Sequence, residues 1–74
     1  MKRASKRLIN ITYTTRLGRD EKTRGFIRPL CGKTPTSEGA CRMIVKAIKD
    51  EDPNARINTL DVFVTRVETM IYQP

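Results

Sequence analysis

Apolar and polar positions alternate along residues 8–17, and this alternation is the clearest structural pattern in the chain. Ile9, Ile11, Tyr13 and Leu17 share one parity, and the other parity holds four polar residues, Asn10, Thr12, Thr14 and Arg16. Period-two alternation that includes β-branched residues is typical of a strand with one buried face. We therefore expect a half-buried strand over residues 8–17, with Tyr13 in the core.

The next segment predicts a turn and a second strand. Residues 18–21 read Gly-Arg-Asp-Glu, which supplies turn chemistry, and residues 22–30 return to an extended pattern in which Arg24, Phe26 and Arg28 share a face. Pro29 cannot donate a ladder hydrogen bond, so this strand should lie at a sheet edge or end there. The two segments together predict a β-hairpin.

A helix is expected between this hairpin and about residue 50. Its start has two candidate caps: Thr34, followed by Pro35 at the first helical position, and Thr36 as a competitor. Pro53 forbids its continuation. The apolar stripe at helical spacing consists of Ala40, Ile44, Ala47 and Ile48.

Residues 57–72 are rich in β-branched side chains and predict a last strand whose pattern changes phase. Leu60, Val62 and Val64 follow one parity, whereas Phe63, Val67 and Ile71 follow the other. Such mixing indicates a centre that is buried on both faces or a β-bulge near residues 61–66.

These elements define the expected fold class, a single α+β domain of ββαβ type. The helix must cross over between the second and third strands, and a right-handed crossover favours an antiparallel sheet of order 2-1-3. We assign residues 1–7 to a flexible basic arm and residues 8–72 to the domain. A 74-residue chain has a thin core, so one sheet face should stay open or be covered by a partner, such as a second copy in a homodimer.

Positive charge is concentrated in the first 33 residues. This segment holds ten of the fifteen Lys and Arg residues and two of the eight acids, a net charge of +8 against +7 for the whole chain. Such clustering favours a polyanion or an acidic surface as partner. The expected contact residues of the arm and hairpin are Lys2, Arg3, Lys6, Arg7, Arg16, Arg19, Lys22, Arg24 and Arg28.

The residues needed for enzymatic or metal chemistry are scarce, so we expect no catalytic site, no metal and no cofactor. The chain has no His, which excludes Ser-His-Asp and Cys-His arrangements. Cys31 and Cys41 are too few for a zinc site and are expected to be reduced thiols, with a disulfide as the alternative under oxidising conditions.

Gly32-Lys33-Thr34 before the helix resembles the end of a phosphate-binding P-loop, but that motif needs Gly four positions before the Gly-Lys pair. Ile27 stands there, so a nucleotide site is not expected. A weaker expectation remains: Lys33, beside the helix start, contacts a phosphate or another anion.

The hairpin-helix-strand layout and the segment Val62-Phe63-Val64-Thr65-Arg66-Val67 resemble the small phage-encoded inhibitors of host RNA polymerase. That family closes with a similar Val-Thr-Arg-Val strand. The resemblance implies that an Arg of the last strand, here Arg66, contacts the polymerase. The second Arg of that pattern, two places further on, is replaced by Glu68.

Two functions follow as expectations. The first is a small, non-enzymatic, cytoplasmic accessory protein that binds DNA or RNA mainly through phosphate contacts. The alternative is a phage or mobile-element regulator that inhibits a host nucleic-acid enzyme, either RNA polymerase or a defence nuclease, by protein–protein contact. Neither involves a membrane, because no apolar run approaches the length of a membrane helix.

Overall fold

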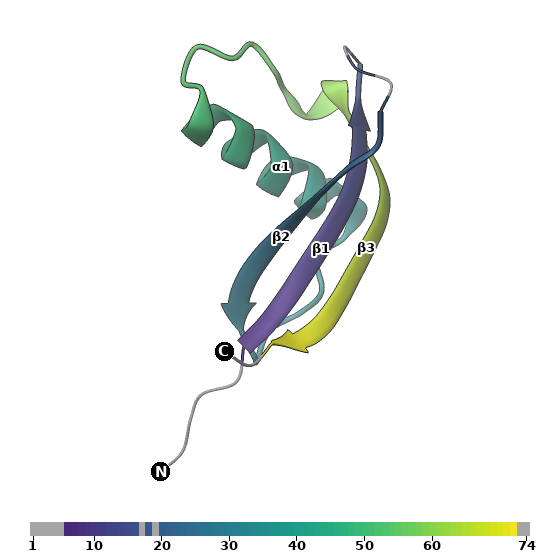
Figure 1. The fold of residues 1–74 in the computed structure, drawn as a ribbon, viewed down its shortest axis with the longest axis vertical. Helices are drawn as coiled ribbons and strands as arrows, with labels where there is room; N and C mark the ends of the chain where they lie inside the picture. The colour runs from purple at the N-terminus through teal and green to yellow at the C-terminus, as the bar shows by residue number, and fades with distance from the viewer. Residues whose placement is uncertain (1–5, 17, 19, 73–74) are drawn as a thin grey trace.

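One helix packs on a three-stranded sheet (Figure 1). The computed structural model describes residues 6–16, 18 and 20–72. Along the chain the elements are β1 (Lys6–Thr15), β2 (Lys22–Pro29), α1 (Ser37–Glu51), the 3-10 helix η1 (Thr59–Asp61) and β3 (Val62–Tyr72).

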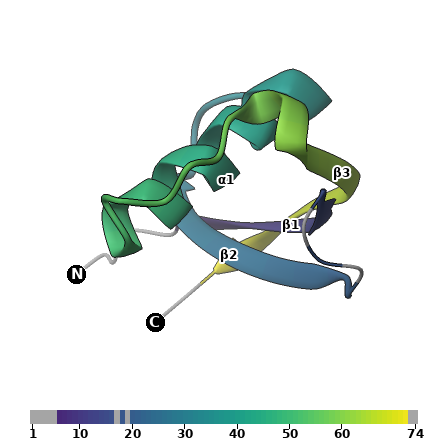
Figure 2. The same ribbon diagram turned by 90° about the horizontal axis from the view of Figure 1, so that it is seen from above.

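The sheet has the order β2-β1-β3, and both neighbouring pairs are antiparallel. This confirms the expected ββαβ fold and the 2-1-3 order. Seen from above, α1 lies on one side of the sheet, and the opposite face is left bare by the elements that the structure describes (Figure 2). The sheet therefore has a helix face and an open face.

The core forms where β1 meets the helix. Ile9, Ile11 and Tyr13, the alternating residues of β1, are buried, and Ala40 and Ile44 of α1 pack against them. Burying a large aliphatic side chain contributes about 1.5–3 kcal/mol, so this small set supplies much of the fold's stability. Leu17, expected on the same face, lies outside the described residues.

The structure shifts some of the expected element boundaries and decides between the two candidate helix caps. β1 begins at Lys6, so Lys6 and Arg7 are strand residues and not part of an arm. Of the two candidates, Thr36 caps α1, because its side chain accepts a hydrogen bond from the Gly39 amide. Residues 57–61 do not extend β3: the segment ending at Asp61 forms η1 instead.

A β-bulge explains the phase change in β3. Thr12 pairs with Arg66, whereas the next residue, Tyr13, pairs with Val64, which leaves Thr65 as the extra residue. The bulge lets Val62 and Val64 face the helix on one side of it and Val67 on the other. Of the two alternatives that the pattern allows, a centre buried on both faces or a bulge near residues 61–66, the structure shows the bulge.

Within the described part of the chain, the helices are too short or too polar to cross a membrane. The same residues contain no group of three or more Cys, Asp or Glu side chains arranged to hold a metal ion. Cys31 and Cys41 are both free thiols in the structure, Cys31 exposed and Cys41 half-buried.

Candidate nucleic-acid interface

Four cationic residues gather where β1 begins and β2 ends. Arg7 pairs with Arg28, so these two cations are direct neighbours across the ladder. Lys6 pairs with Pro29 one position further along, and its side chain lies on the opposite face of the sheet. Lys33 in the following loop joins them, because its carbonyl oxygen accepts a hydrogen bond of 3.1 Å from Arg7 Nη1. We call Lys6, Arg7, Arg28 and Lys33 the basic end of the sheet.

Arg7 organises the loop that follows β2. Its Nε donates to the Pro29 carbonyl at 2.9 Å, and its Nη1 reaches Lys33. The backbone of Gly32 passes close to this guanidinium and has a φ of 136°. A Cβ at that position would lie 2.9 Å from Arg7 Nη2. The loop therefore folds around this guanidinium, which fixes Lys33 beside the strand ends and uses two of the Arg7 donors, Nε and Nη1, within the loop.

The charges of this end are not neutralised within the described residues. None of the four cations has a carboxylate within 4.0 Å in that part of the chain, where the ion pairs form elsewhere. Lys6, Arg28 and Lys33 are exposed. The Arg28 guanidinium lies 5.5 Å from the centre of the Phe26 ring, a cation–π contact that orients it without cancelling its charge.

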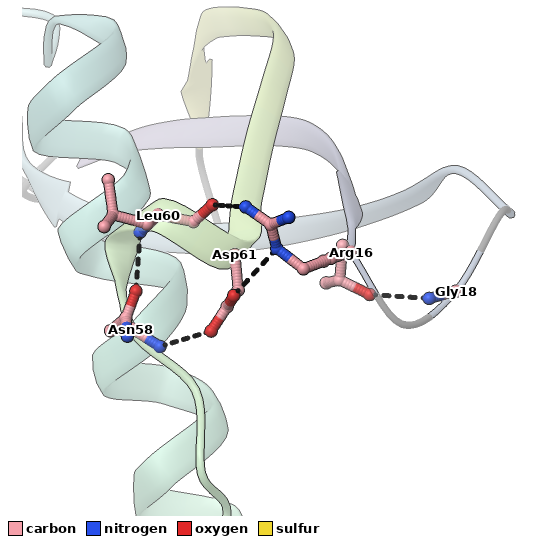
Figure 3. Close-up of polar contacts among 6 residues, drawn as sticks. Arg16, Gly18, Asn58, Leu60 and Asp61 are labelled. Atoms are coloured by element: carbon pink, nitrogen blue, oxygen red, sulfur yellow. Dashed lines mark hydrogen bonds and ion pairs between the residues drawn. The ribbon is translucent and has the colours of Figure 1, made fainter.

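Arg16, at the other end of the sheet, stabilises the fold through hydrogen bonds to the segment before β3 (Figure 3). Its Nε donates to the Asp61 carboxylate at 3.2 Å, and its Nη2 donates to the Leu60 carbonyl at 3.3 Å. Asp61 also accepts a bond from the Asn58 amide, and Asn58 in turn caps η1. Arg16 thus ties the end of β1 to the turn before β3.

Arg24 is also committed to the fold. It faces the helix and makes a bidentate ion pair with Glu51, both N–O distances being 2.8 Å, while its Nε donates to the buried Tyr13 hydroxyl at 3.2 Å. Hydrogen bonding to Glu51 and then to Tyr13 raises the pKa of Arg24, and the same bond from Arg24 lowers the pKa of Glu51. This contact fastens the C-terminal turn of α1 to β2.

The remaining expected contact residues are dispersed. Lys22 is exposed at the start of β2, far from the basic end, and Arg66 lies on β3 with Glu68 as a loose partner at 3.9 Å. Arg66 and Glu21 also line a polar hollow of about 410 Å³ on the open face, together with Thr12, Thr23 and Thr65. Lys2, Arg3 and Arg19 lie outside the described residues.

The structure thus separates cations that the sequence had grouped as one surface. A signal for part of this separation was present, because Arg24 shares strand parity with Phe26 and therefore points toward the helix. The pairing of Arg16 with Asp61 depends on η1, and no local pattern indicated it. Sequence reasoning also missed that Arg7 is a loop organiser, since it had placed this residue in the arm.

Comparison with known proteins adds no relative: no protein-family model, no curated protein and no solved structure matches the chain.

Proposed function

We propose that this protein binds nucleic acid through phosphate contacts made by the basic end of the sheet. The observation that carries the proposal is that three exposed cations without a carboxylate partner among the described residues, Lys6, Arg28 and Lys33, lie at the same end of the sheet. Polyanion affinity derives largely from counterions that are released when such cations meet phosphates. The protein acts as a non-enzymatic accessory factor.

The geometry suits the phosphate backbone better than the bases. Residues opposite each other on paired strands have Cβ atoms about 5 Å apart, so Arg7 and Arg28 present adjacent positive charges, and Lys33 adds a third beside them. Backbone contacts of this kind position a protein without reading sequence. Lys2 and Arg3, which precede β1 in the sequence, add two further positive charges.

Fluorescence anisotropy with labelled DNA duplex and with single-stranded RNA tests the proposal. The logarithm of the association constant should fall linearly with the logarithm of salt concentration, by about 0.9 per phosphate neutralised on duplex DNA. We expect a slope that corresponds to about three to six phosphates, from the basic end and the two preceding cations. Failure of both nucleic acids to bind at low salt would disprove the proposal.

A matched pair of variants locates the contact. In Lys6→Gln/Arg28→Gln/Lys33→Gln, three charges of the basic end are removed and Arg7 is kept to preserve the loop. We expect an affinity about 100-fold lower, since each phosphate contact contributes on the order of 1 kcal/mol. The control carries the same charge change on three exposed cations of α1, Arg42→Gln/Lys46→Gln/Lys49→Gln. Equal losses in both variants would mean that net charge, and not this end of the sheet, governs binding.

The alternative proposal is a phage-type regulator that inhibits a host nucleic-acid enzyme by protein contact. Arg66 favours it, because its side chain is exposed beside a polar hollow on a strand at the edge of the sheet. Inhibition of transcription by purified bacterial RNA polymerase, compared between the natural chain and Arg66→Ala, tests this role. Inhibition that persists when the DNA template is saturating, and that Arg66→Ala abolishes, would favour it over phosphate binding.

A further inference from the structure

The open face of the sheet carries a short apolar row near the basic end. Leu8 of β1 pairs directly with Ile27 of β2 and with Met70 of β3, so the three side chains lie side by side across all three strands. Ile27 and Met70 are 46% and 49% exposed, and Leu8 between them is half-buried. No described element packs over this row (Figure 2).

Opposite charges stand on the two sides of the apolar row. Lys6 lies one row toward the basic end, and Glu68, which pairs with Asn10, lies one row toward the middle of the sheet. Within one chain these two residues are four positions apart along the ladder, about 13 Å, too far to form an ion pair. Along the strands, the open face is therefore positive at Lys6, apolar at the Leu8 row and negative at Glu68.

We propose that this face binds a second copy of the same chain, with the two sheets stacked and their strands antiparallel. A two-fold axis that runs across the strands at the apolar row places Leu8, Ile27 and Met70 on their own counterparts. The same rotation brings Lys6 of each copy toward Glu68 of the other, across a sheet spacing of about 10 Å. Both ion pairs and the apolar contact repeat by symmetry, as an isologous interface requires.

Charge distinguishes a second copy from other occupants of this face. Parallel stacking would set Lys6 against Lys6, and a uniformly acidic segment or a nucleic acid lying along the face would meet Glu68 and Glu21. Among the described residues, the charged side chains placed on this face are Lys6, Arg66, Glu68 and Glu21, whose charges sum to zero although the whole chain carries +7. A surface that is positive on one side and negative on the other complements its own inverted copy.

The proposed interface is small and is coupled to polyanion binding, a coupling that rests on the proposed function. Three apolar side chains per copy bury far less than the ~800 Å² per partner of a stable complex, so the free protein should associate weakly. The dimer pairs Lys6 with Glu68 of the other copy and leaves Arg28 and Lys33 of both copies exposed. The positive charge of two basic ends is then joined in one particle, and a polyanion that contacts both ends favours the dimer.

Sedimentation equilibrium without nucleic acid, at about 0.15 M salt and up to about 1 mM protein, tests the interface itself. We expect a monomer–dimer equilibrium whose dissociation constant rises about tenfold or more in Ile27→Thr/Met70→Thr, because apolar contact area is lost. The control, Leu60→Thr/Ile71→Thr, changes two residues that are 75% and 66% exposed and lie off the open face. Equal weakening in both variants, or no association of the natural chain, would overturn the inference.

A charge exchange tests the orientation of the two copies. Lys6→Glu and Glu68→Lys should each weaken the dimer by several-fold, and the double exchange should restore it, because the intermolecular pairs are then rebuilt with reversed polarity. Independent, additive losses in the double variant would contradict antiparallel stacking. Circular dichroism confirms that each variant is folded.

Titration with a duplex of about 20 base pairs separates this inference from the proposed function. Cooperative binding should become non-cooperative in Ile27→Thr/Met70→Thr while the salt slope is unchanged. A chain that binds DNA but never dimerises sinks only the inference, and a chain that dimerises without binding polyanions sinks only the proposed function and the coupling. Capture of phosphatidylcholine vesicles or of oligothymidine by the apolar row, with no self-association, would also overturn the inference.

Discussion

The two ends of the sheet use the same residue type for different purposes. At the hairpin end, Arg16 and Arg24 each donate to a carboxylate and to a second oxygen, so their charges stabilise the fold. At the basic end, Arg28 and Lys33 have no acidic partner within the described residues. The number of cations in a segment therefore says little about binding until the position of the carboxylates is known.

Arg7 stands between these two cases. It lies at the basic end, yet its guanidinium is held by two backbone carbonyl oxygens and covered by Gly32. Its charge remains unbalanced by any acid among the described residues, while its donors maintain the loop that positions Lys33. Substitutions near Arg7 should therefore change both stability and binding. Substitutions of Arg16 or Arg24 should change mainly stability, and those of Arg28 or Lys33 mainly binding.

The largest stability effect that tests this comparison is expected for Gly32→Ala. The backbone at this residue has φ of 136°, and the new methyl group would lie 2.9 Å from Arg7 Nη2. We expect the free energy of unfolding to fall by about 1–3 kcal/mol, with weaker nucleic-acid binding because Lys33 is displaced. Urea denaturation and anisotropy measure the two effects. A stable variant with unchanged affinity would show that the loop does not depend on this conformation.

A smaller loss, about 1–2 kcal/mol, is expected for Arg24→Met. The exposed ion pair with Glu51 contributes little, but the buried Tyr13 hydroxyl loses its hydrogen-bond partner. Affinity for nucleic acid should stay within about twofold of the natural chain, apart from the effect of net charge. A large loss of affinity in the folded variant would place Arg24 in the interface and remove the distinction between the two ends.

Acid should weaken this contact in a defined direction. Because the pKa of Glu51 is lowered in the folded state, its contribution is fully present above the ordinary value of 4.5 and is lost as the pH falls through the folded-state value. The stability difference between the natural chain and Arg24→Met should therefore shrink as the pH falls below about 4.5. Urea denaturation at several pH values measures it. A difference independent of pH would assign the effect to Tyr13 alone.

The smallest effect, about 0.5 kcal/mol, is expected for Arg16→Gln. Its side chain is 62% exposed, so water and salt screen its pair with Asp61. Thermal denaturation at low and high salt measures the loss, which should decrease as salt increases. A loss of several kcal/mol would mean that η1 depends on this residue for its formation.

The sequence predicted the fold class from periodicity and the strand order from the handedness of the crossover. Alternation along β1 identifies Ile9, Ile11 and Tyr13, and the phase change in β3 is explained by the bulge, one of the two alternatives that the pattern allowed. Parity along a strand also tells which face Arg24 occupies. These are local patterns, and the chain's local preferences agree with its tertiary structure.

The state of each cation could not be predicted from the sequence. The partners of Arg16 and Arg24 lie 45 and 27 residues away along the chain, and they meet only once the sheet and helix have formed. The residues of the apolar row come from three strands and are likewise brought together by register alone. Local patterns do not encode such non-local contacts, so the candidate site became visible only in three dimensions.

Because Thr65 is one extra residue in β3, the number of residues in the strand decides which side chains of each half face the helix. Its hydroxyl bonds to the Thr12 carbonyl oxygen, but many side chains could occupy this position. Removing the residue would instead rotate one half of the strand by half a turn and exchange its inner and outer side chains. Substitution of Thr65 should therefore be tolerated far better than its deletion. A deletion here would disturb both the core and the apolar row of the open face.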